Sequence, residues 1–168
     1  MKRRAAFIIF AVLAATVIAL SAPIAAADAP VKSEFVFSDT GVVQGGCPFE
    51  VVNSASGSGT ETDFFDSSGN LRRIHLHVTE VSTFSANGKS LTSNPFTYEI
   101  TLIFDEGEIT GASISGIITK VPLPDGGLFV SAGRVDLAAR GFPQFILTPD
   151  EGTSVKLDEF CAALAPVT

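Results

Sequence analysis

The sequence predicts an all-β fold: a single antiparallel β-barrel, or a sandwich, of about seven to eight strands with a short C-terminal helix. Short extended segments recur along the chain, with turn residues between them at spacings of roughly 8–15 residues. The 14 phenylalanines supply core bulk in a chain that has no tryptophan. Glycines interrupt the long central segments, which favours a barrel because a sheet must curve before it can close.

The first elements are expected to be short. Residues 34–37 could form a strand or an arm, and residues 49–53 alternate moderately. The GSG sequence at 57–59 is expected to break the extended pattern, which resumes over 60–65. The DSSGN sequence at 66–70 has the composition of a turn.

The central elements carry the clearest alternation. Residues 71–85 form the longest extended segment, and the Asn87-Gly88 pair after it is a strong hairpin signal. Residues 96–104 alternate strictly between apolar and polar side chains, which predicts a half-buried strand. The DEGE sequence at 105–108 predicts the next tight turn.

The last strands are expected at 109–121, 128–137 and 142–148, with a loop over 149–152. The first of them contains glycines at 111 and 116, which indicate a bend or a β-bulge.

The first 27 residues have the pattern of a secretory signal peptide. Basic residues at 2–4 precede an apolar run from Ala5 to Leu20, and the small residues Ala25 and Ala27 suit cleavage after Ala27. The apolar run is short for a spanning helix of about 20 residues, although an uncleaved N-terminal anchor remains the alternative. No second run of spanning length follows, so we expect a secreted, extracellular domain over 28–168 without a stable membrane span.

The charge of the chain excludes some partners. Its 18 acidic residues outnumber its 11 basic residues, giving a net charge of −7, and three of the basic residues belong to the predicted signal peptide. An acidic surface repels phosphate groups, so we expect no binding to nucleic acid or to anionic lipid headgroups.

The two cysteines, Cys47 and Cys161, predict one structural disulfide bond, because an even pair in an exported protein is usually oxidised. Two free thiols are the alternative. The bond would join the start of the domain to a short helix expected over 158–164, with Asp158 as its N-cap and Pro166 after its end.

Five short segments together resemble an uncharacterised family of small secreted proteins common in actinobacteria. They are GGCPF at 45–49, DSSGN at 66–70, ANGKSLTSN at 86–94, SAGRV at 131–135 and DEFCAALA at 158–165. The resemblance covers nearly the whole chain after the signal peptide. It implies a β-rich secreted domain tied by one disulfide bond, and it brings no catalytic residues with it.

The only two histidines, His75 and His77, lie two residues apart on one predicted strand. That spacing places both imidazoles on the same face, as a divalent metal site requires, and with Gly69 it resembles the first cupin motif. The carboxylate of that motif would be Glu80, which comes one residue early. Strand parity then places Glu80 on the opposite face unless a bulge intervenes. The alternative is a polar strand face without metal.

Two acidic turns could bind Ca²⁺ through carboxylate oxygens, although turns are commonly acidic for solubility alone. One contains Asp105, Glu106 and Glu108, and the other contains Asp63, Asp66 and Asn70.

Aromatic residues could line a ligand cavity inside the barrel. Phe96, Tyr98 and Phe104 share one face of a predicted strand, and Phe129 lies on a later one, followed by Phe142 and Phe145. The same residues could instead fill a solid core, which is the expected arrangement.

Three functional hypotheses follow. The first is a secreted, non-enzymatic β-domain with a structural or binding role toward an unknown extracellular partner, without a cofactor. The second is a carrier of a small apolar ligand. The third is a cupin-like, metal-dependent enzyme using His75, His77 and Glu80. No G-x-S-x-G sequence is present to indicate a serine nucleophile.

Overall fold

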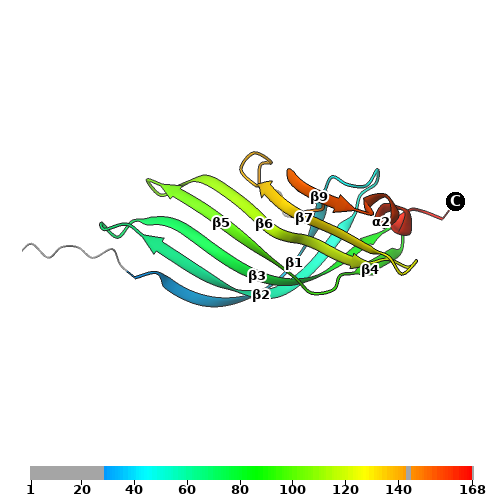
Figure 1. Ribbon diagram of the computed structural model, residues 1–168, viewed down its shortest axis with the longest axis horizontal. Helices are drawn as coiled ribbons and strands as arrows, with labels where there is room; N and C mark the ends of the chain where they lie inside the picture. The colour runs from blue at the N-terminus through cyan, green and yellow to red at the C-terminus, as the bar shows by residue number, and fades with distance from the viewer. Residues whose placement is uncertain (1–28, 143–144, 168) are drawn as a thin grey trace, which may run out of the picture.

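Strands that follow one another in the chain lie side by side in one large, mostly antiparallel sheet (Figure 1). The computed structural model describes residues 29–142 and 145–167. Within these ranges the sheet order is β8-β1-β2-β3-β5-β6-β7-β9, and β4 pairs with β3. The nine strands are β1 (Val31–Gln44), β2 (Val52–Phe65), β3 (Leu71–Ala86), β4 (Lys89–Thr92), β5 (Phe96–Asp105), β6 (Glu108–Pro122), β7 (Leu128–Asp136), β8 (Phe145–Ile146) and β9 (Glu151–Val155).

The sheet keeps two ends and does not close into a barrel within the described part of the chain. At one end β8 pairs in parallel with only Val43 and Gln44 of β1, and at the other end β9 pairs with β7. The chain passes from β8 to β9 through residues 147–150, and these two outermost strands do not pair with each other. The predicted barrel is therefore wrong, because closure requires the outermost strands to bond, and an open sheet or a sandwich fits.

The central strands lie where the alternation predicts them. β3 covers the segment expected at 71–85, the Asn87-Gly88 turn joins it to β4, and β5 covers the segment expected at 96–104. The predicted irregularity of β6 is also present, since its register against β7 shifts between Ile117 and Thr119.

Other strands differ from the prediction. β1 runs for 14 residues where a short strand over 34–37 is expected, and β2 continues through the glycines at 57 and 59. β9 begins inside the loop expected at 149–152, and two of the described residues of the strand expected at 142–148 pair as β8. Backbone pairing with neighbouring strands extends β1, β2 and β9 beyond their local preference.

The glycines of β2 make room for aromatic rings rather than ending the strand. A Cβ atom on Gly57 would lie 2.9 Å from the ring of Phe37, and one on Gly59 would lie 2.7 Å from the ring of Phe35. Both rings belong to β1, whose residues are paired directly opposite these two glycines. The missing side chains therefore let β1 fold its phenylalanines across β2.

Three further glycines form a row across three adjacent strands near the β9 end of the sheet. Gly116, Gly133 and Gly152 lie opposite one another in β6, β7 and β9, with φ angles of 114°, 149° and 143°. A Cβ atom on Gly133 would lie 2.0 Å from the carbonyl oxygen of Glu151. Only glycine adopts this backbone without strain, and it allows the close approach of the adjacent strands.

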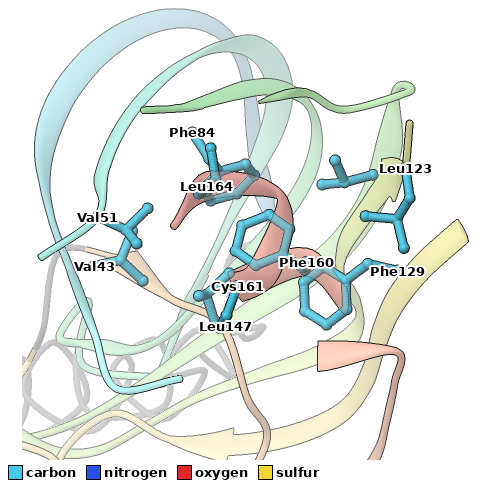
Figure 2. Packing of buried hydrophobic residues seen from close by; sticks show 10 residues of the cluster. Val43, Val51, Phe84, Leu123, Phe129, Leu147, Phe160, Cys161 and Leu164 are labelled. Atoms are coloured by element: carbon cyan, nitrogen blue, oxygen red, sulfur yellow. The ribbon is translucent and has the colours of Figure 1, made fainter. Parts of the chain in front are cut away.

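The main hydrophobic core lies where the sheet meets the C-terminal helix α2 (Leu157–Leu164) (Figure 2). The ring of Phe160 on α2 packs edge-on against Phe84 of β3 at 5.4 Å and tilts against Phe129 of β7 at 4.7 Å. Phe129, Phe160 and Leu164 are completely buried. Burying large side chains of this kind contributes roughly 1.5–3 kcal/mol each, so α2 is a principal source of stability.

The helix ends at Leu164, before Pro166, as predicted, but its N-terminus differs from the prediction. Its N-cap is Lys156 in a left-handed conformation, while Asp158 lies in the first turn, where its charge favours the helix dipole. At the C-terminus of the helix, the β3–β4 hairpin supplies two hydrogen-bond donors to backbone carbonyl groups. Nδ2 of Asn87 bonds the carbonyl of Leu164 at 2.9 Å, and Nζ of Lys89 bonds the carbonyl of Ala165 at 2.6 Å.

The predicted disulfide bond between Cys47 and Cys161 is present, with the two Cα atoms 5.4 Å apart. It connects the segment after β1 to α2 across a sequence separation of 114 residues. A structural disulfide bond indicates an oxidising environment. The predicted signal peptide at 1–27 lies outside the described residues. Within the described residues, no helix has the length and apolar character needed to cross a membrane.

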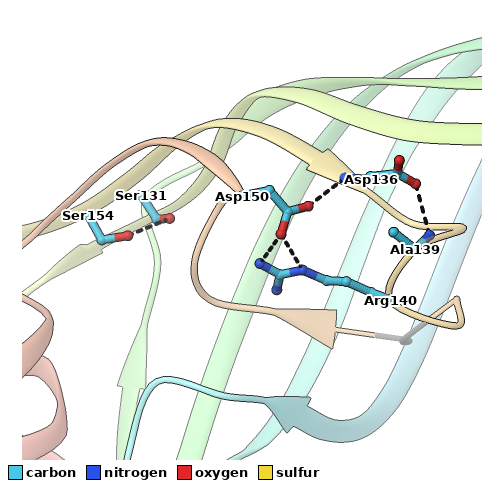
Figure 3. Close-up of polar contacts among 6 residues, drawn as sticks. All are labelled: Ser131, Asp136, Ala139, Arg140, Asp150 and Ser154. Carbon is cyan, nitrogen blue, oxygen red and sulfur yellow. Dashed lines mark hydrogen bonds and ion pairs between the residues drawn. The ribbon is translucent and has the colours of Figure 1, made fainter.

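Asp150 fixes the segment that leads into β9 (Figure 3). Its Oδ2 accepts the backbone amide of Asp136 at 2.7 Å, and its Oδ1 accepts Nε and NH2 of Arg140 at 2.9 and 2.7 Å. These hydrogen bonds, led by the Asp136 amide, hold the pKa of Asp150 below its usual value. The turn after β7 is thereby bonded to the start of β9.

Removing the disulfide bond should destabilise the fold. The Cys47→Ser/Cys161→Ser double variant is expected to lose about 2–4 kcal/mol of unfolding free energy, because the long loop gains entropy when the protein unfolds. Denaturant titration measures this loss, and the wild-type protein in a strong reductant provides the matching control. An unchanged midpoint in both samples would show that the bridge does not anchor α2.

Replacing a glycine of the row should be costly. Gly133→Ala is expected to lose about 3 kcal/mol, because the new Cβ atom meets a neighbouring carbonyl and the φ angle disfavours alanine. The control is Gly111→Ala in β6, where the nearest atom would be 3.5 Å away, and the change should stay within about 1 kcal/mol. Equal effects in thermal unfolding would argue against the close approach.

Candidate functional site

A buried polar cluster lies on the side of the sheet that carries the core, which we call the core face. In β3 the side chains of Val78, Glu80, Ser82 and Phe84 are all buried, while the residues between them are more exposed. Glu80 is 7% exposed and Ser82 is 0% exposed. The two-residue repeat of the strand carries these two polar residues into the interior with their apolar neighbours.

Four polar side chains from three adjacent strands form one hydrogen-bonded chain. The Tyr98 hydroxyl of β5 donates to Oε2 of Glu80 at 2.7 Å, and the Ser82 hydroxyl donates to Oε1 at 2.5 Å. Nδ2 of Asn53 in β2 donates to the Ser82 oxygen at 3.0 Å. The antiparallel registers of β2 and β5 against β3 bring these side chains together.

This chain lines a cavity of about 160 Å³. Asp39 and Thr119 complete its polar lining. The apolar walls come from Phe37, Phe84, Ile114, Ile118, Phe145 and Ile146. A concave, mostly apolar site with a few convergent polar groups is the usual form of a small-molecule site.

One acceptor of the cluster has no hydrogen-bond partner among the residues that the structure describes. Oδ1 of Asn53 is buried without a hydrogen bond, and Asn53 as a whole is only 3% exposed. A buried acceptor left unpaired costs about 1–3 kcal/mol, so few such groups occur in native proteins. This unpaired acceptor therefore belongs to a residue of the cavity lining.

Tyr98 keeps its proton in this environment. Burial, followed by the charge of the adjacent Glu80 carboxylate, raises the pKa of Tyr98 well above its ordinary value. The phenol consequently acts as a hydrogen-bond donor to Glu80. Tyr98 is also the only tyrosine of a chain without tryptophan, so its fluorescence reports on this cavity alone.

The three residues of the predicted metal site are not brought together. His75 and His77 lie on the outer face of the sheet, whereas Glu80 lies on the core face, because the pairing of β3 runs without a bulge from residue 73 to residue 80. Glu99 of β5 lies beside the histidines instead, with its oxygens 3.1 Å from Nε2 of His75 and 2.5 Å from Nδ1 of His77. In the described ranges, no three or more His, Cys, Asp or Glu side chains are arranged to hold a metal ion.

One carboxylate of each acidic turn has a partner in the protein. Oδ1 of Asp66 accepts the backbone amides of Ser68 and Asn70, which lower the pKa of Asp66. Asp105 forms an ion pair with Arg72 at 3.0 Å. These contacts account for Asp66 as a turn-forming group and for Asp105 as an ion-pair partner.

Of the six aromatic residues predicted to line a ligand cavity, Tyr98 and Phe145 do so. Phe96 stacks against Tyr98 at 6.0 Å, and Phe129 belongs to the main core. Phe104 lies near the tip of the β5–β6 hairpin, where it borders a separate depression.

The sequence interpretation missed the polar half of the cavity. Asn53 and Ser82 attract no attention in a chain rich in serine, and Glu80 enters only as a metal ligand. One signal was available: the alternation of β3 predicts that Glu80 and Ser82 share the face of Val78 and Phe84. Two adjacent polar residues on an apolar strand face indicate a buried polar cluster.

No protein-family model, curated protein or solved structure matches this chain. The functional argument therefore depends on the geometry of the site itself.

The phenol of Tyr98 should resist titration. In the folded protein no phenolate absorption is expected as the pH rises through about 10, the ordinary pKa of tyrosine. Because the native state holds this proton more tightly than the unfolded state, Tyr98 should leave stability unchanged below that pH and reduce it above. In Glu80→Gln the phenol should ionise at a lower pH than in the wild type. Ordinary titration in the folded wild type would contradict the buried Tyr98–Glu80 pair.

Proposed function

We propose that this protein is a secreted, non-enzymatic binding domain that holds one small organic molecule in the cavity beside Glu80 and Asn53. The observation that carries the proposal is the combination of apolar walls with a buried, unpartnered acceptor, Oδ1 of Asn53. If the buried polar groups beside the cavity served only the stability of the fold, they would be hydrogen-bonded to one another. An unpaired acceptor on the cavity wall instead suits a ligand that supplies a donor.

The size of the cavity limits the ligand. A cavity of roughly 150 Å³ accommodates a molecule the size of benzene, whereas sites for larger organic ligands are typically about 300–1,000 Å³. At about 160 Å³ the cavity suits a compact molecule of five to seven non-hydrogen atoms better than a lipid. The carrier of a long apolar ligand is accordingly the weaker alternative.

The non-enzymatic part of the proposal is supported by the placement of the titratable groups. General acid–base catalysis usually employs a side chain that exchanges protons near neutral pH. Both histidines of the chain lie on the opposite face of the sheet from the cavity. Tyr98 holds its proton because burial and Glu80 raise its pKa.

Secretion is supported by the signal-peptide pattern of residues 1–27 and by the disulfide bond, which suits an oxidising compartment. Membership in the family of small secreted actinobacterial proteins belongs to the same proposal. An acidic surface favours solubility outside the cell.

The binding function can be tested with three classes of compact probe: cyclopentanol, cyclopentylamine and cyclobutanecarboxylate. None absorbs strongly where Tyr98 does, so a change in Tyr98 emission during titration reports occupancy of the cavity. At least one class is expected to produce a saturable change that Asn53→Leu weakens about tenfold or more, since that variant keeps the number and branching of the side-chain heavy atoms but loses the amide acceptor and its N–H donor to Ser82. Thermal unfolding of the variant checks that it folds. If no class gives a saturable change, the proposed function is wrong.

A further inference from the structure

We infer that the ligand of this cavity is a small organic ammonium ion, whose charged nitrogen binds between Glu80 and Asn53 while its apolar body lies against the aromatic walls. The inference rests on the proposed function, because it names the chemical class of the molecule held in the same cavity. It follows from the charge of Glu80, the absence of a cation beside it, and the arrangement of the acceptors.

Glu80 receives a hydrogen bond at each of its carboxyl oxygens. Ser82 has one hydroxyl proton, and its oxygen already accepts from Nδ2 of Asn53. That proton is donated to Oε1 of Glu80, and Tyr98 donates to Oε2. A carboxylate accepts at both oxygens in this way, so the proposed site uses Glu80 in its charged form.

This buried charge has no cationic partner. None of the ion pairs formed by the described residues includes Glu80, and the residues lining the cavity include no lysine, arginine or histidine. Transferring an unpaired carboxylate from water into a protein interior costs several kcal/mol, and buried charges are normally paired. A cation that enters the cavity would offset this cost directly.

The acceptors suit an ammonium group in number as well as in charge. An ammonium has three N–H donors and no acceptor. Glu80 and Asn53 both bond to Ser82, so the carboxylate and the amide of Asn53, whose Oδ1 is unpaired, contact one hydroxyl group. A neutral alcohol could satisfy one of these acceptors but would leave the charge of Glu80 unpaired.

The remaining walls favour the same ligand. Phe37, Phe84 and Phe145 line the cavity, and aromatic rings attract cations as well as burying apolar groups. A second carboxylate, Asp39, also lines the cavity, which adds to the negative potential. An organic anion would meet repulsion from both carboxylates.

The test compares cyclopentylamine, which is cationic at neutral pH, with the isosteric cyclopentanol, by calorimetry and by Tyr98 fluorescence on the purified protein. The amine is expected to bind at least about tenfold more tightly than the alcohol. Glu80→Gln should abolish this preference, so that the amine and the alcohol bind the variant with similar affinity. The matched control is Glu99→Gln, which removes one negative charge from the outer face of the same sheet and should keep the preference.

Each other outcome overturns the inference in a distinct way. If the alcohol binds as tightly as the amine, the ligand class is wrong and the binding function stands. If only the carboxylate probe binds, Glu80 is not the recognition group. If none of the three binds, both the inference and the proposed function fail. If Glu99→Gln loses the preference as fully as Glu80→Gln, the effect arises from overall charge rather than from the cavity.

Discussion

Continuous pairing of β3 with β2 on one side and β5 on the other decides which side chains can meet. From Arg73 to Glu80 neither register shifts, so successive residues point alternately to the two faces of the sheet. This alternation assigns Glu80 to the core face and the histidines to the outer face. One inserted residue would exchange the faces of everything after it and place Glu80 beside the histidines. The chemistry of both faces therefore depends on an unbroken strand.

The cavity and the core share structural support. Phe84 lines the cavity and also packs against Phe160 of α2, so the helix holds one cavity wall in place. The helix in turn is fixed by the disulfide bond and by the β3–β4 hairpin, through Asn87 and Lys89. Burying Glu80 without a counter-ion reduces stability, and the adjacent apolar packing offsets that cost. A site that includes a destabilising buried charge therefore depends on the stability of the core and helix packed beside it.

The local pattern of apolar and polar residues predicted the strands whose side chains alternate. It failed for the strands whose length and position depend on the neighbours with which they pair. The segments at 71–85 and 96–104 are visible from their period of two, and Asn87-Gly88 marks the hairpin between them. The continuation of β2 through its glycines depends on rings from β1, which no window of local sequence contains. The open sheet likewise depends on where β8 and β9 find partners.

The candidate site was less predictable than the fold. Parity alone indicated that Glu80 faces away from the histidines, and the structure agrees. The meeting of Asn53 with Ser82 requires the register of β2 against β3, which sequence pattern does not fix. The unpaired oxygen of Asn53 becomes visible only when all neighbouring donors have been placed.

The disulfide bond also determines how the molecule responds to cutting and pulling. Cys47 and Cys161 enclose β2 through β9 in one covalent ring, because the bond spans 114 residues of the chain. A protease that cuts any single turn within this ring leaves one covalently connected molecule, whose fragments remain paired in the sheet. A force applied to the two chain ends is carried by the sulfur–sulfur bond and bypasses the strands between them. Extension is then limited to the segments outside the ring, which include β1, so tension removes the cavity walls supplied by Phe37 and Asp39 while the walls supplied by β2 through β8 stay inside the ring.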